Sequence, residues 1–182
     1  MKGFTVKRLG ILTLALLAFV PAAALAGTSP SPAAQSQARQ DCTTLQTSLT
    51  AAIFKQAYGT NVNRSNAFGK CVTKLAGAEQ QNLTTAAGAC RAEQSDANFA
   101  ANHGGKTFDQ TYGTGNLKNA FGKCMSAKAK AASTQDVQAV ENAAKTCSAR
   151  RAADPAAFKT KYGTNANKAN AFGKCVSAEA KI

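Results

Sequence analysis

The fold is decided by Tyr58-Gly59-Thr60 and by the block Asn66-Ala67-Phe68-Gly69-Lys70-Cys71, which occur together three times in the chain. The second copy is Tyr112-Gly113-Thr114 with residues 119–124, and the third is Tyr162-Gly163-Thr164 with residues 170–175. A phenylalanine precedes each tyrosine by four residues, and the tyrosines are 54 and 50 residues apart. A period of this size indicates one structural unit that is repeated along the chain.

The six cysteines follow the same scheme, because each unit has one early and one late cysteine. Within a unit they are separated by 29, 34 and 28 residues. Six cysteines in a secreted chain of this size indicate disulfides. We predict pairing within each unit: Cys42–Cys71, Cys90–Cys124 and Cys147–Cys175. The alternative pairs Cys71 with Cys90 and Cys124 with Cys147, which leaves Cys42 for Cys175.

The first 26 residues have the layout of a secretory signal peptide. Lys2, Lys7 and Arg8 precede an apolar run over residues 9–20, and Ala24-Leu25-Ala26 follows it. We predict cleavage before Gly27. The alternative is an uncleaved anchor, although this run is short for the roughly 20 residues that a membrane span needs. Both place the remaining chain outside the cytoplasm, as an extracellular protein that can associate with the cell wall.

The rest of the chain divides into a linker and three units. Residues 27–40 are rich in Ser, Pro, Ala and Gln without hydrophobic periodicity, which predicts a flexible linker. The units are expected at 41–78, 79–131 and 132–182. Cleavage removes three of the 22 basic residues and none of the nine acidic ones, so the mature net charge is +10, spread over all three units.

Apolar residues recur at helical spacing on both sides of each loop, as Cys42, Leu45 and Leu49 do before the first loop. The glycine after each tyrosine is predicted to end a helix in the left-handed conformation, and Asn66, Asn119 and Asn170 are predicted to cap the next. The glycine before each lysine weakens a helix by up to about 1 kcal/mol relative to Ala, so its recurrence predicts the close approach of another backbone. The expected fold is all-α, with three tandem helical hairpins that are each pinned by a disulfide.

Catalytic chemistry has little support in this sequence. His103 is the single histidine, and it lies in a Gly-rich insertion of the second unit alone. A repeated Ser-His-Asp or Cys-His set is therefore excluded, and no carboxylate pair recurs in all units. No second histidine or Cys-x-x-Cys is present for zinc or haem. We expect no enzymatic activity, no cofactor and no metal.

Basic residues recur around each expected helix start, where backbone N–H groups attract anions. Three weak sites in one chain would bind a polyanion through avidity. The expected partner is an anionic cell-wall or extracellular polymer; nucleic acid would bind only non-specifically, because the chain has no Trp and no nucleic-acid motif. The alternative is a structural or protein-binding module whose charges are simply solvated. The predicted anion-binding residues are Arg64, Lys70, Lys118, Lys123, Lys168 and Lys174.

The Tyr-Gly-Thr and Asn-Ala-Phe-Gly-Lys-Cys blocks resemble those of secreted, alanine-rich hypothetical proteins of high-GC Gram-positive bacteria. The resemblance covers roughly residues 41–182. It implies a secreted location and a repeated unit, and it implies no catalytic or ligand-binding residue.

Overall fold

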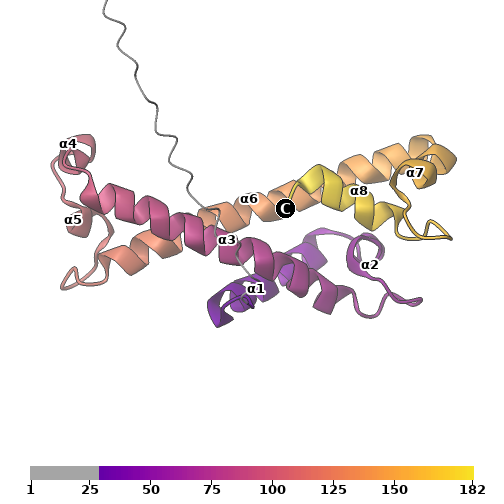
Figure 1. The fold of residues 1–182 in the computed structure, drawn as a ribbon, viewed down its shortest axis with the longest axis horizontal. Coiled ribbons are helices and arrows are strands. Elements are labelled where there is room, and N and C mark those ends of the chain that lie inside the picture. Colours follow the sequence, from indigo (N-terminus) through magenta and orange to yellow (C-terminus); the bar gives the residue numbers. More distant parts are fainter. Residues whose placement is uncertain (1–28) are drawn as a thin grey trace, which may run out of the picture.

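The computed structural model describes residues 29–182, and every regular element in that range is a helix. Two long helices, α3 (Ala67–Ser95) and α6 (Ala120–Ala153), form the frame. With a rise of 1.5 Å per residue, α6 is about 50 Å long. The two helices cross within an elongated molecule (Figure 1). The predicted signal peptide lies outside the described residues.

Six shorter helices attach to this frame. Near one end of α6 lie α7 (Pro155–Tyr162) and α8 (Ala171–Ala180), with α2 (Ala51–Tyr58) beside them and α1 (Pro32–Ser48) under the crossing (Figure 1). At the opposite end, α4 (Phe99–Asn102) and α5 (Phe108–Tyr112) connect α3 to α6. The connection gives the molecule two separate packing regions.

The hydrophobic core is divided between these two regions. The larger core contains 20 buried residues, which come from the first and third predicted units except for Ala38, in the predicted linker. The smaller core, which we call the distal lobe, contains only Cys90, Phe99, Phe108, Ala120 and Cys124, with three partly buried neighbours. The apolar residues of the first and third predicted units therefore pack on each other, while those at the far end of the second predicted unit form a core of their own.

The predicted disulfide pairing is confirmed. Cys42–Cys71 joins α1 to α3, Cys90–Cys124 joins α3 to α6, and Cys147–Cys175 joins α6 to α8. All six cysteines are fully buried. Three disulfides are typical of proteins that fold in an oxidising, extracellular compartment.

The predicted flexible linker is wrong for residues 32–40, because they form the first half of α1. The Ser31 hydroxyl accepts a hydrogen bond from the Ala34 N–H at 3.3 Å, and Pro32 occupies the first helical position, which favours a helix start. Ala34 and Ala38 are fully buried. These small residues concealed the hydrophobic periodicity, yet they let α1 pack closely on the frame.

The expected unit borders, 78/79 and 131/132, fall inside α3 and α6. Each long helix contributes its first part to one predicted unit and its last part to the next. The sequence around both borders is rich in Ala, Lys and Gln, which favour helix, and Gly77 beside the first border does not interrupt α3.

Gly59, Gly113 and Gly163 end helices as predicted, but the predicted left-handed conformation is wrong. All three have φ near −70° and extended ψ. A Cβ at Gly59 would lie 2.4 Å from the Cβ of Arg64, and a Cβ at Gly113 or Gly163 would lie 2.8 Å from Leu117 or 2.7 Å from Lys168. Positive φ belongs instead to the residues that these glycines face, Arg64, Leu117 and Lys168.

Asn66, Asn119 and Asn170 occupy N-cap positions, but none of their side chains caps its helix. The Asn66 side chain closes the preceding loop instead: Oδ1 accepts from the Thr60 N–H at 3.0 Å, and Nδ2 donates to Thr60 Oγ1 at 2.8 Å. The same pair of bonds joins Asn119 to Thr114 and Asn170 to Thr164. We call this arrangement the Thr–Asn clasp.

The Thr–Asn clasp should contribute measurably to stability. Asn170→Ala removes both hydrogen bonds of the clasp, together with a longer one that Asn170 Oδ1 accepts from the Asn165 N–H at 3.4 Å. We expect a loss of about 1 kcal/mol in the free energy of unfolding, measured in urea. Asn142→Ala is the matched control, because Asn142 is exposed on α6 and its side chain has no hydrogen-bond partner among the described residues. Equal stability of the two variants would show that the clasp contributes nothing.

The glycines of the Phe-Gly-Lys blocks do not share one environment. A Cβ at Gly173 would lie 2.6 Å from the carbonyl oxygen of Ala57, at the end of α2, whereas nothing lies within 4 Å of the equivalent point at Gly69 or Gly122. The predicted close approach is therefore confirmed at Gly173 and wrong at the other two. The reason is that only α8 has a helix from another unit packed against it at this position.

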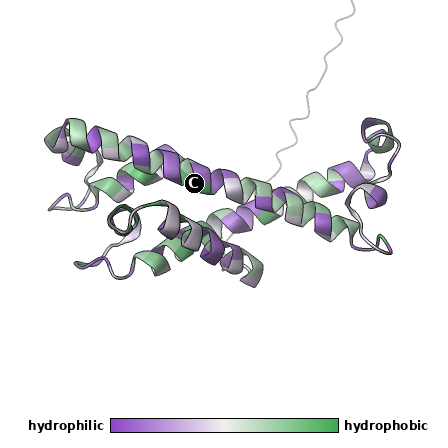
Figure 2. Ribbon diagram, turned by 180° about the vertical axis from the view of Figure 1, so that it is seen from behind, coloured by the Kyte–Doolittle hydropathy of each residue, from purple (hydrophilic) through white to green (hydrophobic). Residues whose placement is uncertain are grey.

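Hydrophobic and hydrophilic residues alternate along the two long helices (Figure 2). Within residues 29–182, no helix combines the length and the apolarity that a bilayer crossing requires.

Candidate functional site: a basic pocket between the first and third loops

The six residues predicted to bind anions do not form three equal sites. Lys70, Lys123 and Lys174 are exposed, each in the first turns of a different helix. Lys118 is also exposed, and its loop places Leu117 at the left-handed position that Arg64 and Lys168 occupy in the other two loops. The structure therefore brings together only Arg64 and Lys168.

These two residues line one pocket of about 190 Å³, which lies between the loop after α2 and the elements α7 and α8. Arg151, near the end of α6, and Lys159, on α7, line the same pocket. No carboxylate is among the lining residues. We call this site the basic pocket; it is lined by Gln56, Arg64, Arg151, Phe158, Lys159, Lys168, Ala169, Ala171 and Phe172.

Arg64 connects the two loops that border the basic pocket. Its Nη2 donates to the carbonyl oxygen of Ala169 at 3.0 Å, so the first loop is attached to the third. Its Nη1 is buried and has no hydrogen-bond partner. The guanidinium therefore keeps donor capacity that its protein contacts do not use.

Arg151 and Lys168 are oriented by neutral groups. The Arg151 guanidinium donates to Gln56 Oε1 and lies 4.7 Å from the centre of the Phe172 ring, a cation–π contact worth about 0.5–1 kcal/mol at a partly exposed site. Lys168 Nζ donates to the carbonyl oxygen of Gly163 at 3.3 Å. These contacts hold the two cations in place without cancelling their charge.

The ion pairs of the described residues lie elsewhere. Over residues 29–182 the two salt bridges are Lys128–Glu93 and Arg150–Glu179. Four cations gathered around one small cavity create a positive local potential, and they repel one another until an anion enters. A bound oxyanion would accept charge-assisted hydrogen bonds from arginine and lysine.

The size of the basic pocket limits what it can hold. Sites for drug-sized ligands usually measure roughly 300–1,000 Å³, so a cavity of about 190 Å³ suits one phosphate, sulfate or carboxylate group. The remainder of a larger anionic molecule would have to extend along the surface outside it.

Reasoning from the repeat missed Arg151 and Lys159. Arg151 follows Cys147 by four residues, so it lies on the same face of its helix as the disulfide, which the sequence could have shown. The equivalent positions in the other two predicted units are Gln46 and Gln94, so the repeat pattern gives no sign of a cation here.

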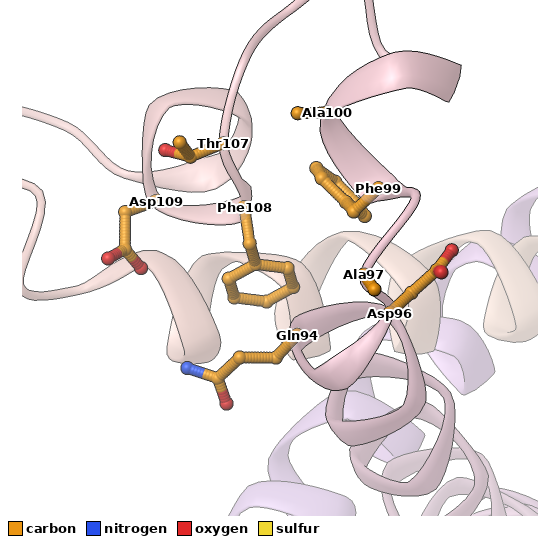
Figure 3. A pocket seen from close by; sticks show the side chains of 8 residues that line it. All are labelled: Gln94, Asp96, Ala97, Phe99, Ala100, Thr107, Phe108 and Asp109. Carbon is orange, nitrogen blue, oxygen red and sulfur yellow. The ribbon is translucent and has the colours of Figure 1, made fainter.

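A second pocket, of about 300 Å³, lies in the distal lobe (Figure 3). Phe99 and Phe108 meet edge to face beside it, with ring centres 5.6 Å apart, and Asp96 and Asp109 stand on opposite sides. Asp96 is already used locally, because its Oδ1 accepts from the Asn98 N–H at 2.9 Å. Within the described chain no group of three His, Cys, Asp or Glu side chains is placed to hold a metal ion.

His103 belongs to the same lobe. It is exposed, its ring stacks on Phe99 with centres 3.7 Å apart, and its Nδ1–H donates to the Phe99 carbonyl oxygen at 2.8 Å. These contacts give the histidine a structural role at the end of α4.

Comparisons of this protein with known protein families, with curated proteins and with solved structures find no match. The charges and contacts of the basic pocket therefore carry the functional proposal.

Proposed function

We propose that this is a secreted, non-catalytic binding protein that associates electrostatically with an anionic cell-surface or extracellular polymer. The observation that carries the proposal is the convergence of four basic side chains on one pocket that no carboxylate lines. The net charge of +10 that the chain keeps after signal-peptide cleavage attracts polyanions without specificity. The basic pocket adds a defined position for one anionic group.

In this proposal the three recurring segments are helical-hairpin repeats, and the pairing of the first with the third creates the site. The shared disulfide offsets and the three Thr–Asn clasps support a common unit. Lys70, Lys123 and Lys174 contribute long-range attraction along the elongated molecule. A polymer with many anionic groups would use the basic pocket and these lysines together, which increases avidity.

A second candidate is a protein-binding module whose charge only maintains solubility. It is favoured by a groove of about 420 Å³ beside α1 and α3, which Phe68, Val72 and Ala76 line with their apolar side chains. A partner in this groove would bind with little dependence on salt and would tolerate changes in the basic pocket.

The proposed function can be tested by retention on immobilised anionic cell-wall polymer, heparin and DNA across a salt gradient, with the oxidised secreted chain. The test variant is Arg64→Gln, Arg151→Gln, Lys168→Gln. The control is Lys70→Gln, Lys123→Gln, Lys174→Gln, which removes the same net charge from exposed positions. We expect the affinity at about 0.15 M salt to fall at least tenfold in the test variant, because each charge-assisted hydrogen bond is worth about 1.5–3 kcal/mol.

The control should lose only the small affinity that follows from three fewer charges. Equal losses in the two variants would mean that net charge alone governs binding and that the basic pocket has no special role. Elution of the wild-type protein at low salt from all three matrices would instead favour the protein-binding candidate.

A further inference from the structure

Three of the nine acidic residues converge where α1, α3 and α6 meet, although the chain is strongly basic. Asp41 on α1 is 6% exposed and Glu79 on α3 is 1% exposed, while Asp136 on α6 is partly buried. Buried carboxylates are unfavourable unless they are paired, hydrogen-bonded or protonated. This cluster therefore needs a physical explanation that the proposed function does not supply.

The hydrogen bonds of the cluster leave two oxygen atoms without donors. Asp41 Oδ1 accepts from Gln37 Nε2 and from the Ser133 hydroxyl, both at 2.9 Å. Asp41 Oδ2 and Glu79 Oε1 are buried and have no partner. Because Asp41 lies within hydrogen-bonding reach of Glu79, one proton held between the two carboxyl groups would supply a donor that this cluster lacks.

The groups that face Glu79 provide no compensating positive charge. On α1 the neighbour is Asp41, on α6 it is Asp136, and on α3 itself Asn82 supplies an amide. Asn82 Nδ2 also donates to Asp136 Oδ2 at 2.8 Å, which keeps that third carboxylate close. Burial, followed by repulsion from Asp41, raises the pKa of Glu79 to about 7.

We propose that Asp41 and Glu79 hold one proton between them, and that loss of this proton as the pH rises through neutrality loosens α1 from α3 and α6. Two adjacent buried negative charges would then repel each other across the helix crossing. Cys42, the residue after Asp41, remains bonded to Cys71, so α1 stays attached. The response is a local opening of the first half of α1, not its release.

The direction of the pH dependence follows from the proton. The folded state binds a proton that the unfolded chain has lost above its ordinary pKa of about 4.5, so stability is greatest below that pH. It should fall between about pH 4.5 and pH 7, and then become constant once the folded state has lost the proton as well.

The experiment measures thermal unfolding of the oxidised full chain at pH 5 to 8.5 for the wild type, Glu79→Gln and Asp41→Asn. We expect the wild-type Tm to fall by about 5–10 °C over this range, and the control Glu141→Gln should show the same fall. Glu79→Gln and Asp41→Asn should each flatten the profile, because a neutral amide donates the hydrogen bond that the proton supplied. Hydrogen exchange of residues 32–41, corrected for its intrinsic pH dependence, should be faster at pH 8.5 only in the wild type and the control.

Two results would overturn the proposal. A pH profile of Glu79→Gln as steep as that of the wild type would place the titrating group elsewhere, and Asp41→Asn provides the same test if the first variant does not fold. The second result concerns calcium. If calcium chloride at about 5 mM raised the wild-type Tm at pH 8.5 to its value at pH 5 and had no effect on Glu79→Gln, a cation rather than a proton would occupy the pair.

Discussion

Replacing Cys90 and Cys124 with alanine is expected to unfold the distal lobe while the rest of the chain remains folded. The lobe has a core of five buried residues, and two of them are these cysteines. Its helices α4 and α5 have four and five residues, lengths that do not persist without tertiary support. The disulfide closes a separation of 34 residues, for which the chain-entropy relation gives about 3–4 kcal/mol.

Limited proteolysis with chymotrypsin measures this effect directly, because Phe99, Phe108 and Tyr112 become accessible when the lobe opens. The matched control replaces Cys147 and Cys175, whose disulfide lies in the larger core of 20 residues. That variant should lose a similar amount of free energy in urea, yet it should resist cleavage at these three aromatic residues. A distal lobe that stays protected without Cys90–Cys124 would contradict the division of the core.

The second large effect concerns three glycines at the same position of the repeated motif. Gly173→Ala places a Cβ 2.6 Å from the backbone oxygen of Ala57, and we expect this overpacking to cost about 1–3 kcal/mol, more than the helix gains from alanine. Gly69→Ala and Gly122→Ala meet no atom within 4 Å, so each should stabilise the protein by up to about 1 kcal/mol.

Urea unfolding of the three single variants measures the change in the free energy of unfolding. Because this change should be negative for Gly173→Ala and positive for the other two variants, its sign alone decides the outcome. Gly173→Ala should also weaken the basic pocket, because Gln56, which holds Arg151, belongs to the same end of α2 as Ala57. The same stability change in all three variants would show that α2 does not press on α8.

Helices and disulfides could be predicted from the sequence because one motif and one spacing rule explain all six cysteines. The role of the asparagines could not, because an N-cap and a Thr–Asn clasp require the same residue at the same position. They differ only in backbone geometry: Asn66 has ψ near 7°, and its side chain is bonded to Thr60. Residues 32–40 were missed because alanines that pack closely give no periodic signal.

The candidate site was predictable only in part, because the sequence did not show which units pack together. The motifs of the three units are nearly identical, so they do not indicate which two units pack together. That depends on α3 and α6, which continue without interruption and place the loop of the second unit at the end of the molecule opposite to the other two loops. Arg64 and Lys168 were found since they recur before the helix starts. Arg151 has no basic counterpart in the other units and joins the site only through the packing of the first unit on the third.

The central claim is that one anionic group occupies the basic pocket, and the most direct test is an NMR titration of the oxidised protein with a short polyphosphate at about 0.15 M salt. We predict that backbone and side-chain signals of Arg64, Arg151, Lys159 and Lys168 shift together with one saturating curve, while those of Lys70 and Lys123 move little. Small, unsaturated shifts spread equally over all exposed lysines would contradict the claim and reduce the interaction to net charge.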